Sequence, residues 1–365
     1  MNSTLSGQLL SKVMGWSDEE LAHELPWLQF MASMKYDSYD QFMPGNRFLA
    51  SLVRWMTQFD SVEDRQLVYD FLKKNLIFIS STQITYLIKL LYTTKIRQDL
   101  IKRVADELKI SPYLVRRIEE TKEFKSSFRR SLVVGLSDGA HIDVLRRAAG
   151  LSNDQVLTNY YPDEDKSKDM LDELQKIESA NAKFATLYLI DDFTASGTSF
   201  IRKEENVYKG KLYKVLEQLA DNRYPMYKLF DSEKMIYIRV FFCVATEYAL
   251  SYLREAINTY IVEKGMSYRF KIEIDSVQII KDDISLQIKE NNELHVLVQK
   301  YFKDSEEVMT KSYRKGKCDQ PYWGYNEGAL PIILSHNTPN NSLPILWQNT
   351  TNFKGLFPRV NRHIQ

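Results

Sequence analysis

Two adjacent carboxylates, Asp191 and Asp192, stand between an apolar run and a cluster of small hydroxyl residues in the stretch LYLIDDFTASGTSF. The apolar run predicts a buried strand of a parallel sheet. In open α/β sheets, ligands bind beyond the carboxyl ends of the strands. The two carboxylates therefore occupy a position where a ligand-binding site is expected.

The residues after the carboxylates suit a phosphate. They are small, and they comprise Thr194, Ala195, Ser196, Gly197, Thr198 and Ser199. Gly197 allows a tight bend, and a helix that begins nearby would aim backbone N–H groups and its dipole at one point. Asp191 and Asp192 would instead accept hydrogen bonds from neutral hydroxyl groups. A ribose 5-phosphate, with its 2′ and 3′ hydroxyls, satisfies both halves of the stretch.

Other phosphate-binding motifs fit this stretch poorly. A P-loop requires Gly-x-x-x-x-Gly-Lys-Ser/Thr, and the stretch contains no lysine. A dinucleotide fingerprint requires three spaced glycines, whereas the stretch has one, Gly197. An aspartyl-phosphate enzyme would separate its two aspartates by one residue.

Strands and helices alternate on both sides of this stretch. Apolar runs predict strands in SLVVGL, ATLYLI and MIYIRVFFCVA, and helices with one apolar face follow them. The run YRFKIEID alternates apolar and charged residues, which is typical of a half-exposed edge strand. This order predicts an α/β fold with a mainly parallel sheet flanked by helices.

The front of the chain predicts helices only. Apolar residues recur at three- and four-residue steps in VEDRQLVYDFLKKNLIFI, and Ser111-Pro112 predicts a further helix start. We therefore expect an all-helical N-terminal domain over residues 1–125 and an α/β domain over residues 126–365. A helix-turn-helix with Arg116 and Arg117 on its second helix is an alternative, but the balanced charge favours a plain bundle.

The composition is that of an ordinary globular protein. Hydrophobic residues make up 44% and charged residues 27%, and the net charge of +1 argues against general coating of nucleic acid. The two cysteines, Cys243 and Cys318, form neither a disulfide framework nor a paired metal-ligand spacing. The sequence has no signal-peptide pattern and no 18-residue apolar run. These features lead us to expect a cytoplasmic protein with no membrane partner.

The stretch LYLIDDFTASGTS resembles the ribose-phosphate-binding signature of type I phosphoribosyltransferases. The resemblance implies a type I phosphoribosyltransferase-like sheet, with Asp191 and Asp192 as the catalytic pair that holds the ribose hydroxyls. Residues 194–199 would wrap the 5′-phosphate. The sequence departs from the signature at Phe193, Thr194 and Ala195 and in the segment FIRKEENVYKG, which delays the helix that normally follows the turn.

A second loop matches the family's pyrophosphate-binding loop by its place in the chain. It comprises Ser137, Asp138, Gly139 and Ala140. The resemblance implies that its backbone binds pyrophosphate and that Mg²⁺, carried by the substrate, bridges the pyrophosphate and the ribose hydroxyls. An ordinary strand-to-helix turn capped by Ser137 or Asp138 is the alternative.

Two further segments correspond to parts of the family's site. TNYYPDEDKSKD lies where the family keeps a mobile loop, although its acidic residues favour a plain solvated connection. GYNEGALPIILSHNTPNNSLPILW carries His336, Asn337 and Asn340, which the resemblance would place around a base or another acceptor. For this segment, a turn before a C-terminal strand is the alternative.

The layout as a whole is similar to phosphoribosyltransferase-like proteins of bacterial conflict (antiphage) systems, including effectors encoded beside retron reverse transcriptases. This resemblance implies a pentosyltransferase-type enzyme that makes or breaks a glycosidic bond at C1 of a ribose 5-phosphate ligand, phosphoribosyl pyrophosphate above all. It would act as a toxic effector. The implied partners are that ligand or a nucleotide, and a reverse transcriptase–nucleic acid complex or another regulator.

Several alternatives stay open at this point. A homo-oligomer is one of the assembly states that the sequence allows. The departures at Phe193, Thr194 and Ala195 support a catalytically inactive, nucleotide-sensing regulator. A nucleic-acid-binding module acting through the helical domain is the third candidate function.

Overall fold

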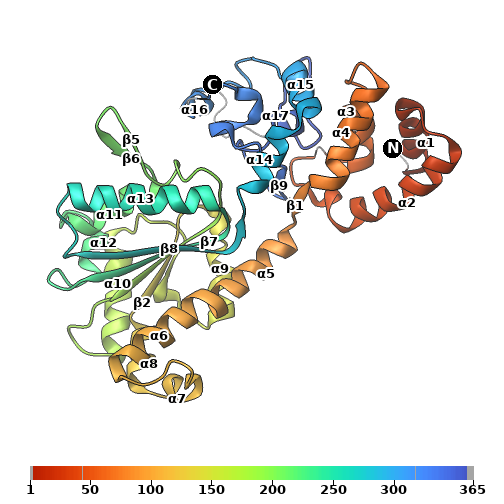
Figure 1. Cartoon of the computed structure of the whole chain (residues 1–365). Helices are drawn as coiled ribbons and strands as arrows, with labels where there is room; N and C mark the ends of the chain where they lie inside the picture. The colour runs from red at the N-terminus through yellow and green to blue at the C-terminus, as the bar shows by residue number, and fades with distance from the viewer. Residues whose placement is uncertain (1–2, 43, 317, 360–365) are drawn as a thin grey trace. The chain divides into compact units, whose positions relative to one another are not determined.

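The chain folds into two compact units in the computed structural model, which describes residues 3–42, 44–316 and 318–359. One unit comprises Met1–Gln83 and Asp282–Gln365, and the other comprises Ile84–Lys281 (Figure 1). This division differs from the expected boundary between residues 125 and 126. Helices that follow residue 84 belong to the sheet unit, so the first boundary lies earlier than expected. The chain after residue 281 returns to the N-terminal helices, which adds a second boundary.

The first unit joins the two ends of the chain around one aromatic core. Phe48, Trp55 and Phe59 from the front of the chain share a single hydrophobic cluster with Leu297 and Phe357. Its two short strands pair in parallel. The elements of this unit are α1 (Ser3–Met14), α2 (Asp18–Met34), η1 (Tyr36–Ser38), α3 (Phe48–Met56), α4 (Val62–Asn75), β1 (Ile77–Ile79), α14 (Asp283–Glu290), α15 (Asn292–Tyr301), α16 (Lys311–Arg314), η5 (Pro321–Trp323), η6 (Tyr325–Glu327), β9 (Ile332–Leu334) and α17 (Pro344–Trp347).

The second unit is an α/β domain around a five-stranded sheet. Its strands lie in the order β3-β2-β4-β7-β8, and every neighbouring pair is parallel. The elements, beginning with a helix that spans the boundary between the units, are α5 (Ser81–Leu91), η2 (Tyr92–Ile96), α6 (Arg97–Leu108), α7 (Val115–Glu119), α8 (Lys122–Arg129), β2 (Ser131–Gly135), η3 (Asp138–Ala140), α9 (Ile142–Ala149), η4 (Asn153–Gln155), β3 (Val156–Leu157), α10 (Glu164–Ile177), β4 (Thr186–Thr194), β5 (Arg202–Glu204), β6 (Val207–Lys209), α11 (Lys211–Ala220), α12 (Pro225–Lys228), β7 (Ile236–Thr246), α13 (Glu247–Glu263) and β8 (Phe270–Ile280).

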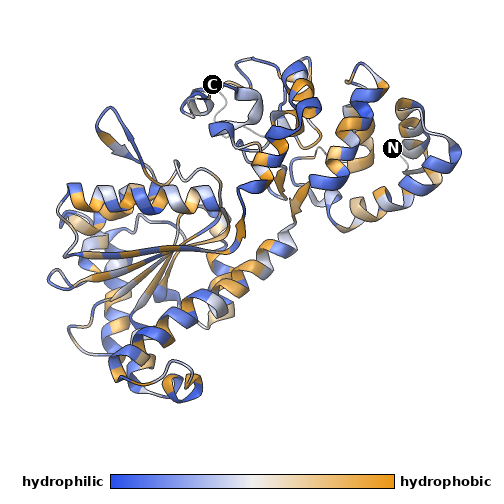
Figure 2. Ribbon diagram, viewed as in Figure 1, coloured by the Kyte–Doolittle hydropathy of each residue, from blue (hydrophilic) through white to orange (hydrophobic). Residues whose placement is uncertain are grey.

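Helices cover both faces of this sheet. On one face, Leu189 of β4 and Val240 of β7 share a hydrophobic cluster with Leu216 of α11 and Leu253 of α13. On the other face, Arg103 of α6 donates hydrogen bonds to side chains of β4. The strands are largely hydrophobic, whereas α13 shows an apolar and a polar side (Figure 2). The expected mainly parallel sheet flanked by helices, with a helical region before it, is confirmed. The expectation that residues 1–125 are all helical is wrong at Ile77–Ile79, which form the strand β1 because they pair with β9.

Single elements differ in detail from their sequence patterns. β8 is the edge strand that its alternating pattern predicts. The helix expected at Ser111-Pro112 begins instead at Val115 and has five residues. Among the described residues, no helix has both the length and the hydrophobicity that crossing a membrane requires.

Candidate functional site

The two carboxylates lie at the carboxyl end of β4, the central strand of the sheet. The strand was expected to end at Ile190, but its pairing with β7 continues to Thr194. Asp191 and Asp192 therefore belong to the strand and not to the turn that follows. Their exposed fractions are only 1% and 7%. The end of the central strand is the position where open α/β sheets bind their ligands.

Two donors from other elements hold Asp191. The hydroxyl of Ser137, in the loop after β2, donates to Asp191 Oδ1. The ammonium of Lys211, at the first residue of α11, lies 2.9 Å from Asp191 Oδ2. Burial, and next the charge of Asp192, raises the pKa of Asp191 to about 6, although Lys211 and Ser137 limit the rise. The charged form of Asp191 therefore depends on its lysine.

Asp192 packs tightly against the loop after β2. A Cβ atom on Gly139 would lie 2.5 Å from Asp192 Oδ2, so this position has no room for a side chain. The Phe193 N–H donates to Asp192 Oδ1 at 2.8 Å. Burial is the main cause that raises the pKa of Asp192. The structure thus brings together two segments that the sequence analysis singled out separately, the acidic pair and residues 137–140.

The hydroxyl turn after β4 is organised by its own side chains. Thr194 Oγ1 accepts a hydrogen bond from the Gly197 N–H at 3.2 Å, and the hydroxyls of Ser196 and Thr198 lie 2.9 Å apart. Gly197 has a φ of 74° and packs against α13, where a Cβ atom would lie 2.8 Å from Tyr252. This combination of left-handed backbone and close packing requires glycine. Of the predicted residues, Ala195 and Ser196 are buried and Ser199 is exposed.

A hairpin interrupts the connection between this turn and its helix. Strands β5 and β6 pair in antiparallel fashion and carry the chain away from the turn and back again (Figure 1). The chain then resumes beside the point where it left, because the Lys211 N–H donates to the Ser199 carbonyl at 3.1 Å and the Leu212 N–H to the Phe200 carbonyl at 2.8 Å. The segment that delays the helix in the sequence is thus an insertion, and α11 still begins at the turn.

Sequence reasoning missed Lys211, which the structure brings to Asp191. Its ammonium also lies 5.0 Å from the centre of the Phe200 ring. The available signal was a Gly-Lys pair before an apolar-faced helix, but nothing in the spacing related this lysine to an aspartate 20 positions earlier. Lys211 supplies the positive charge that the opening stretch itself lacks.

The charge of the acidic pair also contributes to raised pKa values of two other groups. Burial, the neighbouring Tyr161 and the charge of Asp191 raise the pKa of Tyr160, which lies in the connection before α10. Burial and both carboxylates raise the pKa of the Cys243 thiol in β7, which keeps that thiol uncharged. Tyr160 therefore adds an aromatic hydroxyl near the pair. Cys243 stays a thiol, and a thiol that is not ionised is a poor nucleophile.

The acidic part of the connection over residues 158–169 starts a helix. Asp163 is the N-cap of α10, and its carboxylate accepts a hydrogen bond from the Lys166 N–H at 2.7 Å. Glu164 and Asp165 lie in the first turn of α10, where acidic residues complement the helix dipole. The shorter segment that remains before Asp163 contains Tyr160 and Tyr161, whose ring centres lie 4.6 Å apart.

His336, Asn337 and Asn340 belong to the unit built around the N-terminal helices, whereas Asp191 belongs to the sheet unit. Their polar groups hold the fold of that unit. The Gln41 amide donates to the His336 carbonyl, and the Tyr325 N–H donates to the Asn340 carbonyl. Asn337 Oδ1 accepts a hydrogen bond from the N–H of the next residue, Thr338. Their part in a pocket with the acidic pair therefore stays a prediction.

A parallel sheet that carries an acidic pair, and then a hydroxyl turn, at the end of its central strand defines a phosphoribosyltransferase-like protein. The chain belongs to the PRTase-CE family, whose model matches residues 52–359 and so includes the whole sheet unit. The kind of enzyme that this family indicates is a transferase of the pentosyl type. No curated protein and no solved structure shows a significant match to the chain.

Proposed function

We propose that this protein binds a ribose 5-phosphate ligand, phosphoribosyl pyrophosphate above all, and makes or breaks a glycosidic bond at C1 of the ribose. The observation that carries the proposal is the convergence of Asp191, Asp192 and the 137–140 loop at the end of β4 in a PRTase-CE family member. In this proposal, residues 194–199 hold the 5′-phosphate and the 137–140 loop faces the pyrophosphate.

The carboxylates would accept hydrogen bonds from the ribose hydroxyls. Ser137 and Lys211 already donate to Asp191, so ligand hydroxyls would join or replace these donors. Positive charge develops at C1 as the glycosidic bond breaks, and a preorganised pair of buried carboxylates stabilises such charge without a covalent nucleophile. Lys211 would keep the pair ionised before the ligand arrives.

Magnesium would enter with the pyrophosphate of the substrate. The carboxylate oxygens of Asp191 and Asp192 are hard donors of the kind that Mg²⁺ prefers, so the residues present fit a substrate-borne ion. The ion would neutralise pyrophosphate charge as this group leaves.

For the biological role, we propose a toxic effector of antiphage defence that a partner holds inactive. The support is the likeness of the layout to conflict-system proteins encoded beside retron reverse transcriptases. A reverse transcriptase–nucleic acid complex or another regulator would then be the partner. The proposed place of action is the cytoplasm.

A catalytically inactive nucleotide sensor is the second candidate. It is favoured because Asp191 and Asp192 are almost fully buried and Asp191 is already satisfied by Ser137 and Lys211. Nucleic-acid binding through the helices has less support, since α7 is one short helix and its Arg116 pairs with Glu120 at 3.3 Å.

The test is a mass-spectrometric screen of the purified protein with Mg²⁺ and phosphoribosyl pyrophosphate, NAD or nucleotides. The matched control is the double variant Asp191→Asn/Asp192→Asn, which keeps the side-chain shapes but removes both charges. Turnover by the wild type that is lost in this variant supports the enzyme. Turnover that survives in the variant contradicts the assignment of Asp191 and Asp192 to the active site. Binding without turnover favours the sensor, and no binding of any ribose phosphate at millimolar concentration contradicts both functions.

A further inference from the structure

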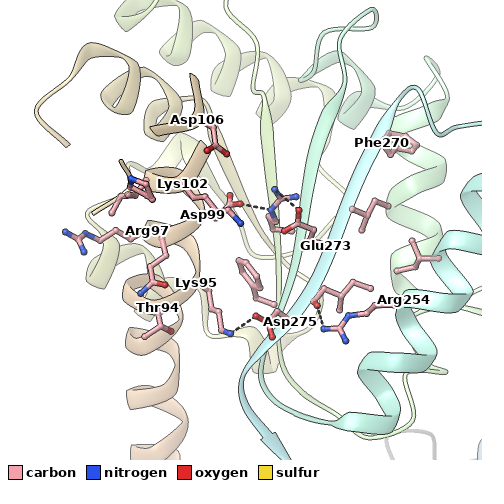
Figure 3. Close-up of a pocket in the computed structure, with 18 of the residues that line it drawn as sticks. Thr94, Lys95, Arg97, Asp99, Lys102, Asp106, Arg254, Phe270, Glu273 and Asp275 are labelled. Atoms are coloured by element: carbon pink, nitrogen blue, oxygen red, sulfur yellow. Dashed lines mark hydrogen bonds and ion pairs between the residues drawn. The ribbon is translucent and has the colours of Figure 1, made fainter. Parts of the chain in front are cut away.

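The edge strand β8 has no strand on its outer side among the described residues. A cavity of about 1050 Å³ lies along this side, with α6 at one flank and α13 at the other. Figure 3 shows Lys102 and Asp106 of α6 on one side of the strand and Arg254 of α13 on the other. A long, accessible strand edge is a template for pairing with another chain.

The orientation of the backbone of β8 follows from one contact. Arg254 Nη2 donates to the Ile274 carbonyl at 2.9 Å, so residue 274 directs its backbone groups away from β7. Backbone directions alternate along a strand, and therefore Phe270, Ile272 and Ser276 direct theirs outward too. The Phe270 N–H already donates to the Met266 carbonyl at 3.2 Å, and the Ser276 N–H to Asp275 Oδ1 at 2.8 Å. The stretch that is open for pairing is thus centred on Ile272.

The charges beside Ile272 are available to a partner. Lys271 is exposed and has no carboxylate partner in the described part of its own chain. The side chain of Glu273 is 58% exposed, and Arg239 approaches it only to 3.4 Å. Asp275, by contrast, is already paired with Lys95 at 2.6 Å. An incoming strand would therefore meet an exposed cation whose ammonium lies 5.9 Å from the centre of the Tyr237 ring. Two positions away it would meet an exposed anion with one 3.4 Å contact to Arg239.

We propose that β8 pairs antiparallel with β8 of a second copy of this chain, about a twofold axis at Ile272. Each Lys271 then lies opposite Glu273 of the other copy, which forms two ion pairs across the axis. Ile272 lies opposite itself and exchanges two backbone hydrogen bonds across the axis, and the Ile274 N–H of each copy donates to the Phe270 carbonyl of the other. Arg254 keeps the Ile274 carbonyl, because the Phe270 N–H that lies opposite this carbonyl is already bonded within its own chain.

Neighbouring registers bring like charges together. An axis at Glu273 sets this residue opposite itself, and an axis at Ile274 sets Glu273 opposite Asp275. Like charges directly opposite each other are destabilising, whereas the axis at Ile272 avoids both conflicts. The charge pattern of the strand thus favours one register of self-pairing.

The first test measures mass by light scattering for the wild type, Lys271→Glu and Glu273→Lys. We expect the wild type to have twice the 42.8 kDa of one chain, and each variant to dissociate at least about tenfold more easily, since each sets like charges opposite each other at two positions. An equimolar mixture of the two variants restores opposite charges at both positions and should recover the dimer. A wild type that is monomeric at about 100 µM overturns the proposal. A dimer whose dissociation is unchanged by either substitution also overturns it, and so does a mixture of the two variants that does not form a dimer.

The second test locates the axis by cross-linking, in protein whose Cys318 is replaced by Ser. Opposite residues of a hydrogen-bonded pair have Cα atoms about 5.5 Å apart, within reach of a disulfide. Ile272→Cys should therefore oxidise to a covalent dimer, whereas Gln278→Cys, on the same strand but away from the axis, should stay monomeric on a non-reducing gel. Equal cross-linking of the two variants, or none at position 272, contradicts the register. Neither test depends on the function proposed above.

Discussion

Lys211 Nζ lies 2.9 Å from Asp191 Oδ2, although 20 positions separate the two residues in the chain. The β5–β6 hairpin carries the chain out and returns it to the hydroxyl turn, where the Lys211 N–H meets the Ser199 carbonyl. The insertion therefore leaves the start of α11 in place. As a result, a buried acidic pair gains a cation from outside its own motif.

The first prediction concerns the removal of this cation by Lys211→Met. The buried pair then loses its main compensating charge, so the pKa of Asp191 should rise further and the carboxyl should be protonated at neutral pH. We expect the free energy of unfolding to fall by about 1–2 kcal/mol in urea denaturation, since the lysine is partly exposed. We also expect affinity for phosphoribosyl pyrophosphate, measured by calorimetry, to fall about tenfold or more.

Lys214→Met is the matched control for this variant. Lys214 lies in the same helix and approaches the Tyr161 ring at 6.0 Å. Its removal should change the free energy of unfolding by less than about 0.5 kcal/mol. Equal losses in the two variants would mean that helix content, and not the contact with Asp191, explains the effect.

The second prediction concerns pH. The pKa of Asp191 rises from an ordinary 3.8 to about 6 in the folded protein, so the folded state binds more protons than the unfolded state between these values. The contribution of this group to stability is therefore fully present below pH 3.8 and is lost as the pH rises to about 6. Unfolding of Asp191→Asn, which cannot titrate there, should lack this loss.

The measurement is the difference in free energy of unfolding between the wild type and Asp191→Asn from pH 4 to 7, because other carboxylates with lowered pKa values cancel in the comparison. The wild type should lose stability relative to the variant over this interval. Ligand binding that needs the carboxylate should strengthen above a pH of about 6. A difference that does not change with pH would show that Asp191 does not titrate in this range.

The third prediction concerns Gly139→Ala. The new Cβ atom would lie 2.5 Å from Asp192 Oδ2, so either the carboxylate or the loop has to move. We expect ribose-phosphate affinity to fall about tenfold or more, with a loss of stability of about 1–3 kcal/mol. Gly150→Ala is the comparison, since a Cβ there meets no atom within 4 Å and costs only left-handed backbone strain. Unchanged binding in Gly139→Ala would detach Asp192 from the ligand site.

The fourth prediction concerns the boundaries of the sheet unit. A fragment of residues 84–281 should unfold cooperatively when followed by circular dichroism, because it holds the sheet with both helical layers. A fragment of residues 126–365 should not, since it lacks α6. Asp99 of α6 lies 2.8 Å from Arg239, which is 3% exposed, so this guanidinium would lose its closest carboxylate. Cooperative unfolding of the second fragment alone would restore the boundary at residue 125.

Local pattern was enough to predict the sheet and its edge strand. Buried parallel strands read as continuous apolar runs, and β4 and β7 carry such runs, whereas the alternation in β8 marks a strand that is open to solvent on one side. The ends of the strands did not follow from the apolar runs alone: β4 continues to Thr194 because its pairing with β7 extends past its apolar residues.

The division into units could not be read from local pattern. Amphipathic periodicity indicates that one face of a helix is buried, but it does not indicate what covers that face. Helices that precede a sheet therefore have similar sequence patterns whether they pack on that sheet or elsewhere. The same holds for the segment after β8, which joins the core around Trp55 and Phe59.

The sequence by itself determined the chemistry at the end of β4: two adjacent carboxylates followed by a small hydroxyl turn, at the position where α/β sheets bind ligands. Only the tertiary structure decided what surrounds them. It set Gly139 against Asp192 and brought Lys211 to Asp191 across an inserted hairpin. Contacts between residues far apart in the chain depend on how the strands and helices pack, and no spacing along the sequence encodes the distance between two side chains that packing brings together.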